Sequence, residues 1–164
     1  MARTAVFCLL SACVLVAAVS VSAGGNARSA AFLEKNKQKE GVITLPSGLQ
    51  YKVLRQGDGD SHPTVDSPCE CHYKGTLVDG KQFDSSYDRG KPTTFAPNQV
   101  IKGWTEAMQM MVEGDKWEMY IPSDLAYGDR GRPPQIPGGD ALIFTMEIIK
   151  IKGKKVPKKD ADEL

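Results

Sequence analysis

Short stretches of alternating apolar and polar residues predict β-strands at five places in this chain. Successive side chains point to opposite faces of a strand, so such alternation is typical of a sheet with one buried face. The predicted strands cover residues 49–54, 69–75, 81–84, 117–121 and 141–151. The last of them starts with apolar residues on both sides, which predicts a central strand covered by a helix.

A different spacing predicts a short helix between Gly103 and Gly114. Its apolar residues recur at i, i+3, i+4 and i+7, the stripe that a helix buries, and they are Trp104, Ala107, Met108 and Met111. A second short helix is predicted near the N-terminus, starting around Ala30 and ending near Gly41.

Two long loops complete the pattern. Residues 85–97 are polar and contain proline, so we interpret them as a loop or a broken strand. Residues 125–140 hold four glycines and three prolines, too many for regular structure. Loops of that length in a compact domain are uncommon and usually functional. The elements together predict an α+β domain with an antiparallel sheet and one short helix on a face.

The first 23 residues predict a secretory signal peptide. The segment 5–21 is almost wholly apolar, Arg3 precedes it, and the small residues at 21–23 (Val-Ser-Ala) suggest cleavage after Ala23. A retained anchor is the alternative, but the run is at the lower limit for spanning a bilayer and lacks a basic flank. A lipoprotein box at Cys13 is disfavoured because the apolar run continues beyond it.

Length and charge narrow the function classes. The chain has 164 residues, the size of about one domain. It carries 21 Lys and Arg against 20 Asp and Glu, a formal net charge of +1. That balance argues against a nucleic-acid binder.

After signal cleavage the cysteines that remain are Cys69 and Cys71. They share one face of a strand, at the edge of the distance a disulfide can bridge, so we favour two buried core residues over a bridge or a redox pair.

Common catalytic motifs do not match. The chain has no Gly-x-Ser-x-Gly motif, no phosphate-binding loop and no zinc-binding pair of histidines. Cys69 and His72 point to opposite faces of their strand and therefore cannot act together; His72 is interpreted as a solvated strand residue.

The remaining candidate for a functional site is a set of aromatic residues at strand ends, the helix start and loop edges. An apolar pocket with a few polar groups is the usual form of a small-ligand site. The alternative is that these rings are simply core: Tyr73, Phe83, Phe95, Trp104, Tyr127 and Phe144.

Four motifs carry a family resemblance. They are 73–77 (Tyr-Lys-Gly-Thr-Leu), 79–86 (Asp-Gly-Lys-Gln-Phe-Asp-Ser-Ser), 100–104 (Val-Ile-Lys-Gly-Trp) and 126–128 (Ala-Tyr-Gly). With their order and spacing, the chain from about Leu45 to Ile151 resembles the FKBP-type peptidyl-prolyl cis/trans isomerases. The segments 32–36 and 41–51 resemble the macrophage infectivity potentiator branch, whose long dimerising helix is present here only in its last part. We therefore expect a monomer.

The resemblance implies an antiparallel sheet half-wrapped around one short α-helix, with the active pocket between them. It implies no cofactor and no metal. The implied pocket residues are Tyr73, Phe83, Asp84, Phe95, Val100, Ile101, Trp104, Tyr127, Ile136 and Phe144. Trp104 would be the floor, the backbone N–H of Ile101 and the hydroxyl of Tyr127 would donate hydrogen bonds, and Asp84 would bond Tyr73 or the ligand. Arg132 and Gln135 depart from the family pattern in the loop over the pocket.

These inferences divide the chain into a signal peptide (1–23), a helical leader (24–44), an isomerase domain (45–152) and a charged tail (153–164). The expected partners are proline-containing segments of client proteins and macrolide inhibitors, without nucleic acid or a stable membrane anchor. The alternative function is a non-catalytic proline-segment binder or chaperone, acting for instance on host proteins. We expect secretion; the terminal Asp162-Glu163-Leu164 leaves residence in the endoplasmic reticulum as the alternative.

Overall fold

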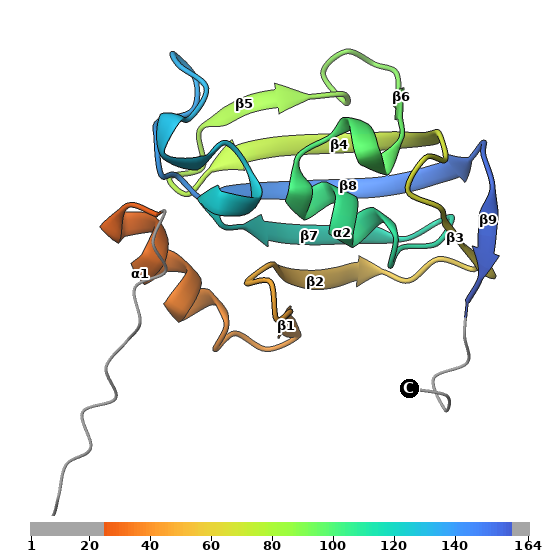
Figure 1. Ribbon diagram of the computed structural model, residues 1–164, viewed down its shortest axis with the longest axis horizontal. Coiled ribbons are helices and arrows are strands. Elements are labelled where there is room, and N and C mark those ends of the chain that lie inside the picture. The colour runs from red at the N-terminus through yellow and green to blue at the C-terminus, as the bar shows by residue number, and fades with distance from the viewer. Residues whose placement is uncertain (1–24, 159–164) are drawn as a thin grey trace, which may run out of the picture.

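The computed structural model describes residues 25–158, so the predicted signal peptide and the terminal tripeptide lie outside the described residues. Its main sheet has seven strands, and every pair in it is antiparallel (Figure 1). Along the sheet the order is β1 (Val42–Thr44), β2 (Gln50–Arg55), β7 (Lys116–Ile121), β8 (Leu142–Ile151), β4 (Cys69–Leu77) and β5 (Gln82–Ser85), and β6 (Thr93–Phe95) also pairs with β4.

The remaining elements surround this sheet. The helix α2 (Lys102–Met108) lies across one face, and α1 (Ala27–Asn36) lies near the β1–β2 edge (Figure 1). A small second sheet pairs β3 (Ser61–Pro63) with β9 (Lys155–Pro157). Three 3-10 turns occur in the connections: η1 (Pro97–Gln99), η2 (Ser123–Leu125) and η3 (Gly128–Arg130). The predicted α+β class, with an antiparallel sheet around one short helix, is confirmed.

The core lies between α2 and the sheet because the strands alternate as the sequence predicted. In β4 every second residue from Cys69 to Leu77 is buried, and β8 follows the same rule through most of its length. β8 pairs with β7 on one side and β4 on the other, which confirms that it is central. Gly103 lets α2 approach closely: a Cβ atom there would lie 2.5 Å from Cγ2 of Ile121 in β7.

The leader helix α1 is attached to the domain at both ends. At its C-terminal end the fully buried Asn36 donates through Nδ2 to Oε1 of Gln50 at 3.0 Å, and Gln50 donates through Nε2 to the carbonyl of Leu33 at 3.0 Å. At its start the backbone N–H of Asn26 donates to the carbonyl of Gly139 at 3.0 Å. The helix begins earlier than predicted because Asn26 accepts from the N–H of Ser29 as an N-cap. It also ends earlier, at Asn36.

Several local predictions need correction. The strands β1, β3 and β9 were not expected; each has only three residues, too few to show a clear alternation. Within 85–97 the broken strand is β6. His72 is not simply solvated: it is half-buried, its Nδ1 lies 2.9 Å from Oγ of Ser86, and its ring stacks on Tyr87. Packing against the following loop, which the strand pattern does not show, explains the difference.

Cys69 and Cys71 are free and buried, as the sequence favoured. Burial raises the pKa of the Cys69 thiol to about 11 and raises that of Cys71 further, so both are poor nucleophiles.

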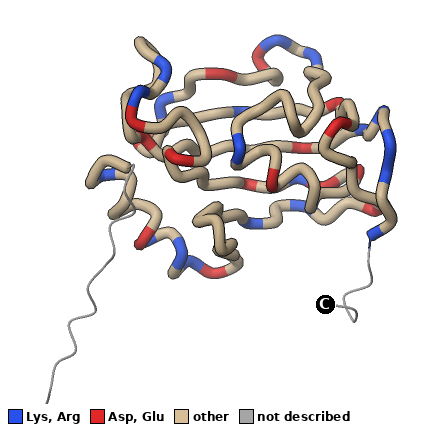
Figure 2. The backbone as a smooth tube through the Cα atoms, in the orientation of Figure 1, with Lys and Arg blue, Asp and Glu red and all other residues tan. Residues whose placement is uncertain are grey.

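Between residues 25 and 158, no helix has the length and apolar character that a membrane crossing requires. Acidic and basic residues are interspersed along the described elements (Figure 2).

Candidate active site

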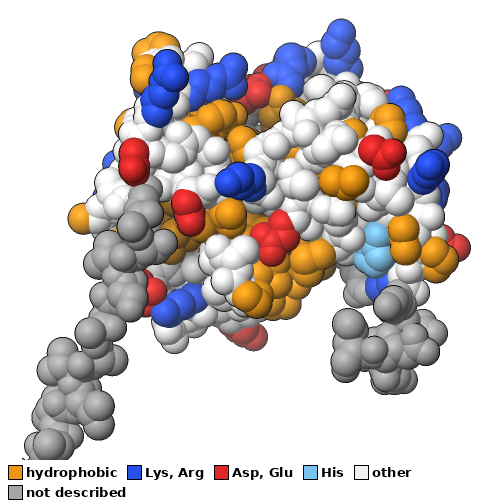
Figure 3. All heavy atoms as spheres, in the orientation of Figure 1, with side chains coloured by type: hydrophobic (Ala, Val, Ile, Leu, Met, Phe, Trp, Pro, Cys, Tyr) orange, Lys and Arg blue, Asp and Glu red, His pale blue; other side chains and the backbone are white. Residues whose placement is uncertain are grey.

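A cavity of about 380 Å³ opens between α2 and the inner face of the sheet. In the space-filling view, hydrophobic side chains are exposed in the hollow between β5 and α2 (Figure 3). Eleven residues line the cavity: Tyr73, Phe83, Asp84, Phe95, Gln99, Val100, Ile101, Trp104, Tyr127, Arg132 and Phe144. Nine of the ten residues expected from the family resemblance are among them. The tenth, Ile136, is buried and lines a neighbouring cavity instead.

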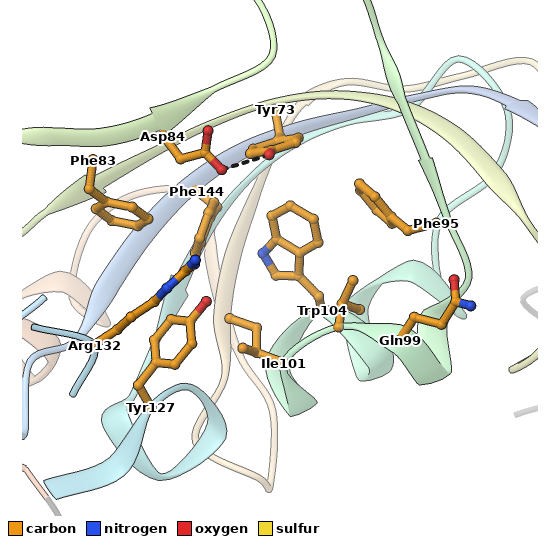
Figure 4. A pocket seen from close by; sticks show the side chains of 11 residues that line it. Tyr73, Phe83, Asp84, Phe95, Gln99, Ile101, Trp104, Tyr127, Arg132 and Phe144 are labelled. Carbon is orange, nitrogen blue, oxygen red and sulfur yellow. Dashed lines mark hydrogen bonds between the residues drawn. The ribbon is translucent and has the colours of Figure 1, made fainter. Parts of the chain in front are cut away.

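Trp104 forms the floor of the cavity because it lies in the first turn of α2 and faces the sheet. Its side chain is held among three aromatic rings (Figure 4). The ring centroids of Tyr73 and Phe144 lie 5.1 Å and 4.8 Å from that of Trp104, and both rings are edge-on to it. Phe95 packs at 5.1 Å on the remaining side. Contacts on three sides hold the indole in one orientation.

A polar cluster lies at the rim above the floor. The hydroxyl of Tyr73 in β4 donates to Oδ2 of Asp84 in β5 at 2.7 Å, as the resemblance implied (Figure 4). Arg89 completes the cluster: it donates to Oδ1 of Asp84 at 2.5 Å and to the Tyr73 hydroxyl at 2.8 Å. Sequence reasoning missed Arg89. A half-buried carboxylate requires a positive partner, which is the signal that could have found it.

This cluster keeps its protonation state across neutral pH. Burial raises the pKa of Tyr73, and its hydrogen bond to Asp84 raises it further. Burial opposes ionisation of Asp84, but the hydrogen bonds from Tyr73 and Arg89 and the charge of Arg89 outweigh it and lower the pKa of that carboxyl. Asp84 is therefore an anion and Tyr73 a neutral donor at physiological pH.

Two hydrogen-bond donors face the cavity from its other side. Ile101 immediately precedes α2, and its backbone N–H donates to no carbonyl within residues 25–158. Tyr127 precedes η3, and its hydroxyl points into the cavity (Figure 4). Unlike the hydroxyl of Tyr73, that of Tyr127 has no hydrogen-bond partner in the described part of the chain. Both groups are therefore available to a bound carbonyl.

The loop after η3 forms a wall shared with a second, smaller cavity. That cavity, of about 240 Å³, is lined by Phe83, Asp84, Arg132, Gln135 and Ile136. The loop is closed by a reciprocal pair of hydrogen bonds: the N–H of Arg132 donates to the carbonyl of Ile136 at 2.8 Å, and the N–H of Ile136 donates back at 3.0 Å. These bonds present the Arg132 side chain toward both cavities.

The arrangement is suited to holding a compact apolar group with polar atoms on its edges. Aromatic rings form the walls, and the two donors lie on one side of the floor. Within residues 25–158, no group of three or more His, Cys, Asp or Glu residues could hold a metal ion. The geometry fits a ring-shaped apolar group flanked by carbonyls, which describes a proline residue in a peptide.

Comparison with known proteins identifies the class that this fold and site define. The model of the FKBP-type peptidyl-prolyl cis-trans isomerase family matches residues 59–149, and that of the domain amino-terminal to such isomerases matches residues 17–53. The chain belongs to the FKBP-type peptidyl-prolyl cis-trans isomerases.

Its relatives include proteins of the branch that the sequence suggested. The chain is 49% identical over 135 residues to a "Macrophage infectivity potentiator" of Trypanosoma cruzi, covering 81% of this chain and 69% of that one. It is 50% identical over 127 residues to a "Peptidyl-prolyl cis-trans isomerase Mip" of Coxiella burnetii, covering 77% and 55%. The chain thus spans about half the length of that bacterial relative.

Solved structures agree on the fold. The crystal structure of FkpA from Escherichia coli superposes with a TM-score of 0.74 at 40% identity, covering 77% of this chain and 59% of that one. A peptidyl-prolyl cis-trans isomerase from Pseudomonas syringae superposes with a TM-score of 0.71 at 38% identity, covering 76% and 91%. The family resemblance read from the motifs is confirmed.

Proposed function

We propose that this chain accelerates rotation about X–Pro peptide bonds in client proteins of the secretory pathway or the extracellular space. The observation that carries the proposal is the aromatic cavity over Trp104, flanked by the donors of Ile101 and Tyr127, which have no partner among residues 25–158. The proline ring rests on the indole, and the neighbouring carbonyls accept from the two donors. Family membership supports the reaction class.

The cavity favours rotation by changing the surroundings of the amide. Amide resonance gives the C–N bond partial double-bond character and places partial charge on oxygen and nitrogen. Water stabilises that charge in the planar form. A dry aromatic cavity removes this stabilisation, so the twisted form, with less charge separation, is disfavoured less. A cavity that fits the twisted proline better than the planar one adds differential binding.

The required acceleration is within reach of these contacts. Uncatalysed rotation takes tens to hundreds of seconds at 25 °C. Shortening the half-life from about a hundred seconds to about ten milliseconds needs roughly 5.5 kcal/mol of transition-state stabilisation. A few buried apolar contacts at about 25 cal/mol per Å², with one or two hydrogen bonds of about 1 kcal/mol each, supply an energy of that order. No titrating group is needed.

Two sequence segments support the proposed location of the clients. The apolar segment 5–21 supports export, and Asp162-Glu163-Leu164 supports retrieval to the endoplasmic reticulum as the alternative. Replacing Ala161 with lysine restores a complete retrieval signal and should increase intracellular retention. If secretion of that variant is unchanged, retrieval plays no role.

A rate measurement on a short X–Pro peptide with residues 24–164 tests the reaction. We expect acceleration by the wild type, inhibition by a cavity-filling macrolide, and a loss of about two- to tenfold in kcat/KM for Tyr127→Phe, the worth of one hydrogen bond. Trp104→Leu, which removes the flat floor, should lose more. Tyr87→Phe, on an exposed tyrosine outside the cavity, is the matched control and should be unaffected.

The alternative is a domain that binds proline segments without catalysis. In that case a folded wild type binds the peptide and the macrolide but leaves the isomerisation rate at its uncatalysed value. Binding that weakens in Trp104→Leu, with no acceleration by the wild type, would establish the alternative and exclude the isomerase.

A further inference from the structure

Arg132 lies where the two cavities meet. Both cavities are lined by Phe83, Asp84 and Arg132, so they share these walls. In the close-up view the Arg132 side chain extends from its loop toward the space between Phe83 and Tyr127 (Figure 4). A group next to one held in the larger cavity can therefore lie beside Arg132.

The charges around these cavities do not balance. The only charged side chains lining them, in the described part of the chain, are Asp84 and Arg132. Asp84 is already paired, because Arg89 forms an ion pair with one of its oxygens and Tyr73 donates to the other. Arg132 has no ion pair and no side-chain hydrogen bond within residues 25–158, and the neighbouring Gln135 is neutral. One positive charge is thus left over at the junction.

An unpaired guanidinium beside a cavity favours a particular ligand group. Arginine presents planar donors that match the two oxygens of a carboxylate. The reciprocal backbone bonds between Arg132 and Ile136 hold the base of the side chain, so its loop needs no rearrangement to present the charge. The amide of Gln135 offers a further donor on the same wall.

We propose that the smaller cavity is a subsite for an acidic side chain, an aspartate or a glutamate adjacent to the proline, and that Arg132 recognises its carboxylate. This inference rests on the proposed isomerase function. The two cavities share the walls of Phe83, Asp84 and Arg132, and an extended chain advances about 3.3–3.6 Å per residue, so the immediate neighbours of the proline lie closest to the adjoining cavity while the ring stays on Trp104. Arg132 acts as a specificity-determining residue.

Matched peptides test the subsite. Two pairs are compared, one with Glu or Gln directly before the proline and one with Glu or Gln directly after it, using kcat/KM for isomerisation by residues 24–164. We expect the Glu peptide of at least one pair to be preferred by about two- to fivefold, because an exposed ion pair is a weak interaction. The preference should vanish between about 0.01 M and about 1 M salt, where the Debye length falls from about 30 Å to about 3 Å.

Three variants separate recognition by Arg132 from a general effect of charge. Arg132→Gln should abolish the preference, and Arg132→Glu should reverse it in favour of Gln. Arg132→Lys, which keeps the charge without the planar fork, should retain part of it. Arg130→Gln is the matched control: this arginine is exposed two residues away and lines neither cavity. Its preference should equal that of the wild type.

The outcomes distinguish the subsite from the reaction itself. Equal rates for Glu and Gln in both pairs, with clear acceleration of all four peptides, overturn the subsite and leave the isomerase intact. A preference that Arg130→Gln and Arg132→Gln reduce equally also overturns it, because a long-range field is then responsible. If a folded wild type accelerates none of the peptides, both proposals fail. A preference lost only in the Arg132 variants supports the subsite.

Discussion

Replacing Gly75 with alanine inserts a methyl group where two rings of the cavity meet. Gly75 lies in β4 directly opposite Phe144 in β8. A Cβ atom at this position would lie 2.6 Å from Cε1 of Phe144 and 2.7 Å from Cε2 of Phe83. These rings pack edge-to-face with centroids 5.5 Å apart. The absent side chain is therefore a condition for their contact.

The size of the effect follows from these distances. Carbon atoms in contact are about 3.5–4.0 Å apart, so the rings must move by about 1 Å. Overpacking of this kind costs about 1–3 kcal/mol of unfolding free energy. Phe144 also packs against Trp104, so a shift of this ring disturbs the floor of the cavity. A misplacement of about 1 Å in a catalytic geometry can lower the rate by up to about a hundredfold.

Urea unfolding and peptide isomerisation of residues 24–164 test both effects. Gly80→Ala is the control: Gly80 has a φ of 86°, so alanine there strains the turn, but a Cβ atom would meet no heavy atom within 4 Å. We expect both variants to lose stability and only Gly75→Ala to lose activity per folded molecule. Phe83→Leu should recover part of the stability in the Gly75→Ala background. Stability within about 0.5 kcal/mol of wild type and an unchanged rate for Gly75→Ala would contradict the expected displacement of the two rings.

Three further predictions concern the ionisation of Tyr73 and Asp84, the cap of α1, and the two cysteines of β4. Because the pKa of Asp84 is lowered and that of Tyr73 is raised, kcat/KM should be constant from about pH 5 to about pH 9. A change of kcat/KM between these two pH values would contradict the expectation. The ionised Asp84 stabilises the fold above the ordinary pKa of an aspartate, and this stabilisation should be lost as the pH falls through the lowered pKa of Asp84. Asn26 caps α1 and donates a hydrogen bond to Asp140, so Asn26→Asp keeps the cap but places two carboxylates side by side. The free energy of unfolding should therefore fall by about 0.5 kcal/mol at low salt and recover at high salt. The control Asn26→Ser should show no such salt dependence. The two cysteines of β4 should react with a thiol reagent only after unfolding, and rapid reaction in the native protein would contradict their burial.

Local patterns sufficed where packing followed the period of the backbone. Apolar residues on both sides at the start of 141–151 predicted a central strand, and β8 is central. The apolar stripe from Trp104 to Met111 predicted α2, although the helix itself ends at Met108. The three-residue strands β1, β3 and β9 escaped prediction because their pairing depends on a neighbouring strand rather than on their own composition.

The site could be predicted in part, because its aromatic residues fall in motifs. The polar partners were harder to find. Arg89 lies in the turn that follows β5, five residues after Asp84, and the path of that turn brings its guanidinium to the carboxylate. Ile136 was expected in the main cavity and lines the adjoining one, because its hydrogen bonds with Arg132 close the loop on that side.

The buried side of each long strand could be predicted from the amino-acid sequence alone, and the family could be predicted from the motifs and their order. Both follow from local properties: side-chain direction along a strand repeats every two residues regardless of the neighbours. Tyr73, Trp104 and Tyr127 come from three separate segments, and the folded arrangement of these segments brings them around one cavity. The same arrangement pairs Asp84 with Arg89 and leaves Arg132 without an ion pair within residues 25–158. Distances between segments far apart in the chain are set by sheet pairing and by packing against α2, which no local pattern encodes.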